Sequence, residues 1–420
     1  MAGPRNYLPK MNGPIRKADV SSLYLFARGG NFGYFNRRFE MVIPAKYPAF
    51  LDGEMSSLCR NFSEGFAGIS LFSRSNDLLL ELFQEESSGG PYDQIRKGKR
   101  GGATFIDTSG RLMANVVFQQ VGDFHDGRAA VMQHRKWGYI DTTGSLAIPC
   151  IFDDVQGFTE GMACVRIDAD GLTGFVDKTG RWAIPLRFDD GLSFSQGLAA
   201  VKIGDLWGYV DHDGSMIVPP RFAQAKAFSD GLAAVNIGQD YRNGKGERGR
   251  WGYIDRTGSF VIEPKFDSVG HFQDGLAFAN PTPPPPGVRN KAEYPDYLRR
   301  LGQCLYGLID RRGQFVVPPR YRAHQPFSEG LASIKMESTD TPHWKFGPLN
   351  SRWGVIDIRG NIVVEPGYTA IGQFVDGLAE ASTLHSESCF YQDDSYYIDT
   401  TGRIAWPPGA TEIRERWTGG

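Results

Sequence analysis

The sequence predicts an all-β fold built from tandem repeats. First, the Asp of a Trp-Gly-Tyr-Ile-Asp phrase is followed twenty residues later by the Gly of a Phe-x-Glu/Asp-Gly phrase, seven times in succession, from Asp107 and Gly127 to Asp357 and Gly377. Second, the segments between these phrases are short, nearly alternating and rich in β-forming residues. Third, 52 Gly and 25 Pro in a chain with 41% hydrophobic residues indicate frequent tight turns around a continuous core. Such a persistent spacing indicates one supersecondary unit repeated along the chain.

Each repeat is expected to contain three strands, as the copy around Trp207 illustrates. Residues 198–203 form the first expected strand, 207–211 the second and 216–218 the third. The Asp-x-x-Gly phrase between the second and third strands places Asp at the first position of a turn and Gly where φ is positive. This is the composition of a type I turn followed by a left-handed residue, so these strands are expected to be antiparallel neighbours.

The segment after the third strand is expected to cross to the next repeat. A Pro falls eight or nine residues after the Asp in most copies, and it lacks the amide that a ladder needs. We therefore expect pairing to stop there, or the third strand to lie at a sheet edge. The crossover phrase Phe-Asp-Asp-Val, at 152–155, is a candidate fourth strand. Aromatic residues recur at fixed positions in every copy and predict a shared core.

Looser copies around Asn36 and Asp399 bring the expected number of units to nine. The array begins on a first strand at 23–27 and ends on a complete hairpin. Nothing is therefore missing at one end that the other end would supply. This favours an open, curved β-superhelix over the alternative, a closed β-propeller.

The expected organisation is one continuous array over residues 23–408, with a lead segment at 1–22 and a tail at 409–420. Nearly all length variation falls between the first and second strands of a unit. Insertions at equivalent sites of a solenoid emerge on one face, which is often the binding face. Two of the insertions are expected to carry short helices, at 76–86 and 292–300. The insertions lie at 71–102, 238–250, 281–302, 338–350 and 382–395.

Composition narrows the classes of function. A net charge of −2 gives no general attraction to nucleic acid or anionic lipid. The five Cys are scattered without a Cys-x-x-Cys phrase, so neither a disulfide framework nor a zinc site is expected. The N-terminal segment lacks the apolar core of a signal peptide, and no stretch approaches about 18 uncharged apolar residues. We expect a cytoplasmic protein without a membrane partner, unless a leader has been trimmed.

Candidate catalytic residues would have to stand outside the repeat pattern. An acidic residue precedes the marker Gly in most copies, but a residue present in nearly every unit has a structural role, and Gln196 replaces it once. We interpret this column as turn-forming and not as a ladder for a metal or substrate. The seven His residues have no metal-ligand spacing, and phosphate-loop and Gly-x-Ser-x-Gly phrases are absent. No enzyme, cofactor or metal site is expected. The acidic column is Asp126, Glu160, Asp230, Asp274, Glu329 and Asp376.

The phrases from Trp137 to Asp141, at Pro149, at 152–155 and from Phe158 to Gly161 resemble the bacterial WG (Trp-Gly) repeat family. The resemblance covers roughly residues 23–408. It implies a bacterial β-repeat protein of variable copy number, from a family mostly without known activity, in which some members are encoded near secreted toxins or attached to effector domains. The eponymous Trp is present only at Trp137, Trp207, Trp251 and Trp353, and this scatter indicates packing instead of chemistry.

Our hypothesis from the sequence is a non-enzymatic protein-binding scaffold that presents variable loops to a macromolecular partner. Neutralisation or regulation of a toxin-like enzyme is one form of that role. Aromatic and basic side chains in the insertions resemble binding surfaces more than linkers. The candidate partner-binding residues are Arg96, Lys97, Arg100, Tyr241, Arg242, Lys245, Arg248, Tyr294, Tyr297, Arg299, Trp344 and Phe346.

The sequence leaves two other kinds of partner open. A carbohydrate-binding array would stack sugar rings on exposed Trp or Tyr residues of the Trp-Gly phrase, and it fails if Trp137, Trp207 and Trp251 are buried. The basic loops at 96–100 and 242–250 offer contacts for phosphate groups, but the near-neutral overall charge disfavours nucleic acid.

Overall fold

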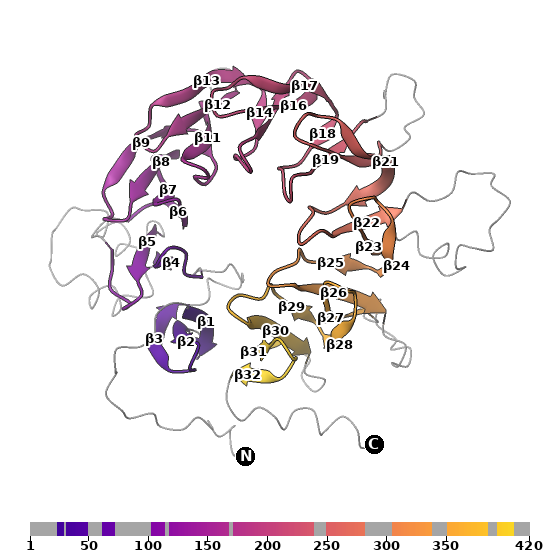
Figure 1. Ribbon diagram of the computed structural model, residues 1–420. Helices are drawn as coiled ribbons and strands as arrows, with labels where there is room; N and C mark the ends of the chain where they lie inside the picture. The colour runs from indigo at the N-terminus through magenta and orange to yellow at the C-terminus, as the bar shows by residue number, and fades with distance from the viewer. Residues whose placement is uncertain are drawn as a thin grey trace, which may run out of the picture. The chain divides into compact units, whose positions relative to one another are not determined.

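The computed structural model describes residues 23–28, 31–48, 61–71, 102–113, 117–167, 171–238, 249–281, 305–337, 351–384 and 393–406 (Figure 1). Within these ranges the chain forms strands and turns and no helix, and the pairings are antiparallel, which confirms the all-β tandem array. The helices predicted at 76–86 and 292–300 lie outside these ranges. In the described part of the chain, no helix has the length and apolar character to cross a membrane.

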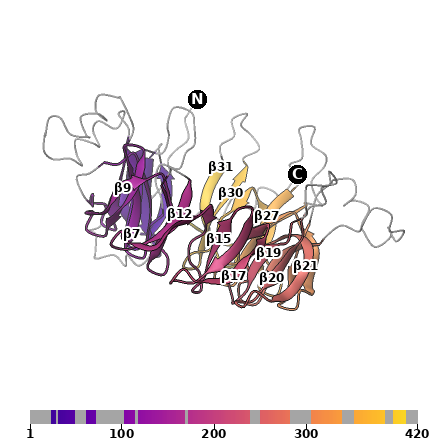
Figure 2. The same cartoon turned by 90° about the horizontal axis from the view of Figure 1, so that it is seen from above.

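The chain divides into two compact bodies. The first contains residues 1–124, 131–134 and 140–145, and the second contains 125–130, 135–139 and 146–420. Strands of neighbouring sheets in the second body, from β15 (Ala199–Ile203) to β21 (Phe260–Val269), have similar inclinations (Figure 2).

The N-terminal sheets are the least regular. The strand pair β4 (Phe66–Leu71) and β5 (Gly102–Asp107) is extended by single bridges from Ala103 to Phe118 and from Ile106 to Leu112. The sheets, in strand order, are β1 (Leu23–Arg28), β2 (Asn31–Asn36), β3 (Met41–Pro48); then β4 (Phe66–Leu71), β5 (Gly102–Asp107); then β6 (Gln120–His125), β7 (Arg128–Gln133), β8 (Lys136–Asp141), β9 (Leu146–Phe152).

The later sheets share one strand order. Each begins with a two-residue crossover strand from the end of one repeat, followed by the first, second and third strands of the next. The crossover is therefore the fourth strand that the sequence indicated. These sheets are β10 (Asp154–Val155), β11 (Met162–Ile167), β12 (Leu172–Asp177), β13 (Trp182–Phe188); β14 (Asp190–Gly191), β15, β16 (Leu206–Val210), β17 (Met216–Phe222); β25 (Ala323–His324), β26 (Leu331–Glu337), β27 (Ser351–Asp357), β28 (Ile362–Tyr368); and β29 (Ala370–Ile371), β30 (Leu378–Leu384), β31 (Asp393–Asp399), β32 (Ile404–Trp406).

Two repeats share a single seven-stranded sheet. There the third strand of one repeat and the crossover that ends the same repeat merge into the ten-residue strand β21. Counted over the described ranges, the sheets hold nine repeats, as predicted. The strands of this sheet are β18 (Gln224–Ala225), β19 (Ala233–Asn236), β20 (Trp251–Ile254), β21, β22 (Ala277–Pro281), β23 (Tyr306–Ile309) and β24 (Phe315–Tyr321).

Each regular sheet has two different ends. On β11 and β12, Met162 lies opposite Asp177 at one end, beside the marker turn and the Asp-x-x-Gly turn, and we name this the turn end. The other end is the loop end, where β15 and β16 are joined by a tight turn with Ile203 opposite Leu206. At the same end, Asn236 lies opposite Trp251, so the described residues that flank positions 239–248 lie at the loop end.

The Gly of the Trp-Gly phrase allows the third strand to approach closely. A Cβ on Gly208 would lie 2.4 Å from the carbonyl oxygen of Val218, and equivalent contacts of 2.5 Å occur at Gly138 and Gly252. The register shifts between Trp207 and Tyr209, across Gly208, so the third strand bulges there. Only a residue without a side chain fits at this approach.

The third-strand Pro lies in this bulge. Pairing breaks at Pro219 and Pro220 and resumes at Phe222, which lies opposite Trp207. The expectation that pairing would stop at the Pro was therefore wrong, whereas the alternative, an edge position, is correct for β17. The reason is that a bulged residue needs no ladder amide.

Aromatic side chains from both marker phrases form the core of a repeat. Tyr209 is fully buried, and its ring meets Phe228 edge-on at a centroid distance of 4.9 Å. The Tyr209 hydroxyl donates to the carbonyl oxygen of Lys226 at 2.8 Å, which ties the second strand to the crossover. Burial raises the pKa of Tyr209, so the phenol remains a donor.

Candidate functional site

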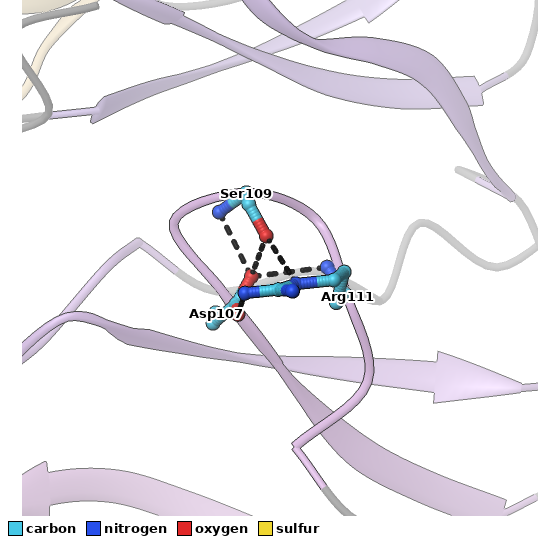
Figure 3. A network of polar contacts seen from close by, with 3 residues as sticks. All are labelled: Asp107, Ser109 and Arg111. Atoms are coloured by element: carbon cyan, nitrogen blue, oxygen red, sulfur yellow. Dashed lines mark hydrogen bonds and ion pairs between the residues drawn. The ribbon is translucent and has the colours of Figure 1, made fainter. Parts of the chain in front are cut away.

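The side chain of the turn Asp accepts hydrogen bonds from its own turn. The Asp107 Oδ1 atom accepts the amides of Ser109 at 2.8 Å and Arg111 at 3.1 Å, and also the Ser109 hydroxyl (Figure 3). Gly110 has a φ of 78°, as expected for the left-handed residue that follows the turn. Equivalent pairs of amide bonds are made by Asn36, Asp141, Asp177, Asp211, Asp255, Asp310, Asp357 and Asp399.

These bonds favour the carboxylate form. The pKa of Asp177 lies below its ordinary value because the Thr179 hydroxyl and the backbone amides of Thr179 and Arg181 donate to it. The turn Asp therefore has a structural role.

The acidic column before the marker Gly forms turns, as predicted, and also links successive repeats. Glu160 and Gly161 have φ values of 51° and 82°, the positive pair that a type I′ hairpin needs. The Glu160 carboxylate accepts the amide of Gly197 in the next repeat at 3.0 Å. Gln196 forms the same link to Gly231 at 2.8 Å, so the position requires an acceptor and not a charge. Further links join Asp126 to Gly161, Asp230 to Gly275 and Glu329 to Gly377.

Hydroxyl groups reinforce these links. The residue before the acid is often Ser, and the Ser195 hydroxyl donates to the carbonyl oxygen of Phe228 in the next repeat at 2.7 Å. Equivalent bonds run from Ser229 to Phe272 and from Ser328 to Phe374.

Basic groups also reach this end. Lys178 Nζ lies 2.6 Å from Asp126, and His212 Nε2 lies 3.2 Å from Glu160, close enough for an ion pair when the ring is protonated. The turn end of the second body is thus a packed junction between repeats. Within the described residues, no three His, Cys, Asp or Glu side chains are grouped to hold a metal.

A row of apolar side chains lies just beyond the turns. We name as the third-strand row the residues five positions after the turn Asp in the second body. The exposed fractions of Leu146, Trp182, Met216, Phe315 and Ile362 lie between 36% and 49%, which is high for large apolar side chains. Phe260 and Ile404 complete the row and are half-buried.

The row continues the aromatic core to the surface. The Trp182 ring meets Phe152 of the preceding repeat edge-on at a centroid distance of 6.2 Å. Phe315 meets Phe266 of the preceding repeat in the same way at 6.0 Å. The rings of Trp182 and Phe315 are therefore held in place by the repeat before them.

Exposed cations lie beside this row. The guanidinium of Arg221 stands 5.0 Å from the ring centroid of Phe222 and hydrogen-bonds to the Gly258 carbonyl of the next repeat. The Arg320 guanidinium does the same over Tyr321, with a 2.9 Å bond to the Gly360 carbonyl. Arg187 and Lys265 occupy equivalent positions over Phe188 and Phe266.

The sequence carries a signal for this row that lies outside the two marker phrases. The position five residues after the turn Asp, or after Asn36, is a large apolar residue in all nine repeats, although its identity varies among Met, Leu, Trp, Phe and Ile. No fixed letter marks it. Constancy of class at a surface position is the signal that identifies it.

The structure does not describe all of the residues that the sequence singled out. All twelve candidate partner-binding residues, from Arg96 to Phe346, lie outside the described ranges. The Trp residues of the Trp-Gly phrase are described and half-buried. Trp207 packs against a core cluster built from its own repeat and the next, and Trp251 lies beneath Lys226, whose Nζ is 5.2 Å from its ring centroid.

Family comparison agrees with this architecture. The family model described as "WG containing repeat" matches eight segments that together span more than half of the chain: 32–71, 104–137, 137–169, 174–207, 207–241, 251–280, 306–339 and 353–382. The chain belongs to the WG containing repeat family. The matched segments of this WG repeat protein contain the second and third strands of successive repeats and their crossovers. No curated protein matches the chain significantly.

Solved structures show only weak likeness to the WG repeat protein. The β-propeller domain of the Trilobed protease from Pyrococcus furiosus, described as having an open velcro topology, is 10% identical and has a TM-score of 0.38, covering 84% of this chain and 96% of that one. Kluyveromyces lactis Hsv2 is 9% identical with a TM-score of 0.29, covering 67% and 75%. A protein of unknown function from Bacteroides caccae is 17% identical with a TM-score of 0.23, covering 57% and 92%. With TM-scores below 0.5, these likenesses carry no argument about architecture or function.

Proposed function

We propose that this WG repeat protein is a non-enzymatic scaffold that binds a partner protein through the third-strand row together with the insertion loops. The observation that carries the proposal is the row itself: large apolar side chains exposed at equivalent positions of successive repeats. Exposed apolar surface that continues from one repeat to the next is typical of protein interfaces. Neutralising or regulating a toxin-like enzyme is one form that this role takes.

The neighbouring cations define the chemistry of the partner. Arg187, Arg221, Lys265 and Arg320 are exposed along the same strands as the row. Aromatic and Arg side chains are the usual anchors of protein interfaces. A partner surface that combines apolar and acidic side chains is complementary to this arrangement.

The polar columns support a role without catalysis. The turn Asp, the marker acid and the marker Ser form hydrogen bonds within or between repeats. Groups held in this way are structural, whereas the third-strand row is exposed and open to a partner.

A carbohydrate partner is less well supported. Stacking of sugars needs exposed aromatic ring faces, but Trp137, Trp207 and Trp251 are half-buried against their own cores. A glycan array distinguishes the two proposals, because tight, selective glycan binding that survives loss of the row would favour the carbohydrate array.

The test has two matched arms. The partner is captured from the native organism, identified by mass spectrometry, purified and measured by calorimetry. The row variant replaces Leu146, Met216 and Ile362 with Ser, three side chains for which no aromatic contact is described. The matched variant replaces Ile151, Ile203 and Leu206, equally exposed apolar residues outside the row. We expect the row variant to weaken binding at least about tenfold, or about 1.4 kcal/mol, and the matched variant to bind normally.

Loop deletions complete the design. Removing residues 239–248 leaves Gly238 next to Gly249, a two-residue hairpin whose flanking Ile237 amide already bonds to the Arg250 carbonyl at 3.2 Å. A second variant lacks 282–300. Both are expected to fold and to bind more weakly. Undiminished binding by the row variant and by both deletions would overturn the proposed function.

A further inference from the structure

The crossover strands carry one polar position that differs between repeats. Gln156 directly follows the crossover strand β10. Its side-chain amide both donates to and accepts from the next crossover. Its Nε2 donates to the Gly191 carbonyl at 2.8 Å, and its Oε1 accepts both the amide and the hydroxyl of Ser193, each at 2.8 Å. A neutral side chain that both donates and accepts therefore provides all the hydrogen bonds that this junction needs.

Lys226 occupies the equivalent position two repeats later. Its Nζ donates to the Val269 carbonyl at 2.7 Å, the counterpart of the Gly191 carbonyl. An ammonium has no acceptor, however, so it cannot serve the backbone amide of His271, the counterpart of the Ser193 amide. Lys226 therefore supplies the donor that Gln156 supplies at its own junction, but it does not supply the acceptor.

Two imidazoles come from the next two crossovers. His271 follows directly after Val269 and Gly270, and its ring hydrogen-bonds to the backbone of Ala227, next to Lys226. His324 stacks on Phe278 with a centroid distance of 3.9 Å and meets Tyr306 edge-on at 4.7 Å. A Cβ on Gly270 would lie 3.7 Å from His324 Cε1, so this ring covers the same segment.

Lys226 and the His324 ring thus lie against the segment from Val269 to His271, and His271 adds a third basic group. Burial and the neighbouring Lys226 charge lower the pKa of both His271 and His324, and burial lowers the pKa of Lys226. Among the described groups that act on these imidazoles, Lys226 is the charged one. Lys226 and His324 are half-buried whereas His271 is exposed. An ammonium next to a backbone amide is chemistry that binds oxyanions.

We propose that Lys226, His271 and His324 form an oxyanion-binding site at the crossover edge, which takes a phosphate group or a carboxylate. The anion supplies the acceptor that Gln156 provides in the earlier repeat. It accepts from Lys226 Nζ and from the His271 amide, and it lies beside the two imidazole rings. This site goes beyond the proposed function and does not depend on the third-strand row.

The repeats supply a substitution that tests the site without disturbing the fold. Lys226→Gln installs the side chain found at position 156, which spans the same junction. Lys202→Gln removes one positive charge from β15, outside the cluster, and is the matched control. The full chain is titrated with sodium phosphate, and separately with sodium acetate, at constant ionic strength and pH 6.5. Binding is followed by the NMR signals of the His271 and His324 ring protons.

We expect saturable shifts of both imidazole signals in the wild type and in Lys202→Gln, with a Kd on the order of 1 mM for the better anion. Lys226→Gln should fold normally and bind at least about tenfold more weakly. Tighter binding of phosphate assigns the site to a phosphate group, and tighter binding of acetate assigns it to a carboxylate. Equal binding by Lys226→Gln and wild type, or no saturable shift with either anion, would overturn the proposal.

Discussion

The side-chain oxygen of Gln196 accepts the backbone amide of Gly231 at 2.8 Å, the same link to the next repeat that Glu160 makes to Gly197. The link is a hydrogen bond that needs no charge. It explains why a column that looks like a ladder of carboxylates tolerates an amide, and it leads to the first of four predictions.

Asp230→Asn should leave the free energy of unfolding within about 0.5 kcal/mol of wild type, because Asn also accepts hydrogen bonds and tolerates positive φ. Asp230→Gly keeps the backbone relaxed at the native φ of 51° but removes the acceptor for the Gly275 amide. That variant should lose about 1 kcal/mol in urea unfolding. If Asn is as destabilising as Gly, the charge matters and the interpretation is wrong.

Gly208→Ala should destabilise the protein by about 2–3 kcal/mol, because the added Cβ would stand 2.4 Å from the Val218 carbonyl oxygen on a rigid strand. Gly367→Ala is the matched control, since its Cβ would meet only the Glu365 oxygen at 3.9 Å. Thermal unfolding of both variants provides the comparison. Equal melting temperatures would show that the third strand yields easily at the bulge.

Tyr209→Phe should cost about 1 kcal/mol, because it removes the donor to the Lys226 carbonyl while keeping the ring in the core. The native Phe175 fills the equivalent position in the preceding repeat, so the fold should persist. Urea unfolding measures the loss, and an unchanged free energy would mean that water replaces the phenol.

His324 should make stability depend on pH. Burial lowers its pKa to about 4 from an ordinary 6.5, so below pH 6.5 the unfolded chain binds a proton that the folded chain refuses. Stability should therefore fall as the pH is lowered from 6.5 to 4, by at most about 3 kcal/mol from this residue. Denaturant unfolding at several pH values measures the slope.

His324→Val provides the control for that slope, because Val155 and Val269 occupy the same crossover position in other repeats. The variant should reduce the slope between pH 6.5 and 4 without abolishing it, because burial also lowers the pKa of His271. A slope as steep as that of the wild type would assign the effect to other groups, and an NMR pKa near 6.5 for His324 would contradict its burial.

Local chemistry made much of the fold predictable. The Asp-x-x-Gly turn forms from the Asp and Gly within it, and the Gly258 φ of 86° follows from the sequence of that turn alone. The crossover strand at Asp154 and Val155 was also indicated, because its residues lie between two fixed markers. Short-range spacing therefore determined the repeat, its hairpin and the number of repeats.

The links between repeats were not predictable in this way. Glu160 and Gly197 are separated by 37 residues, and only the packing of one sheet against the next makes the Glu160 carboxylate an acceptor instead of a turn former alone. The exposure of Trp182 was equally unpredictable, since an apolar side chain in a strand is expected in the core. Whether a side chain is covered depends on the neighbouring repeat, which no local pattern specifies.

The sequence by itself determined that the chain is a WG repeat array with turns built by Asp and Gly, because those features depend on bonds within one repeat. The tertiary structure alone decided which side chains join repeats and which remain on the surface, including the third-strand row and the cluster of Lys226, His271 and His324. The physical reason is that contacts and burial between repeats arise only when sheets pack, and the same residue type is structural or available according to what then lies beside it.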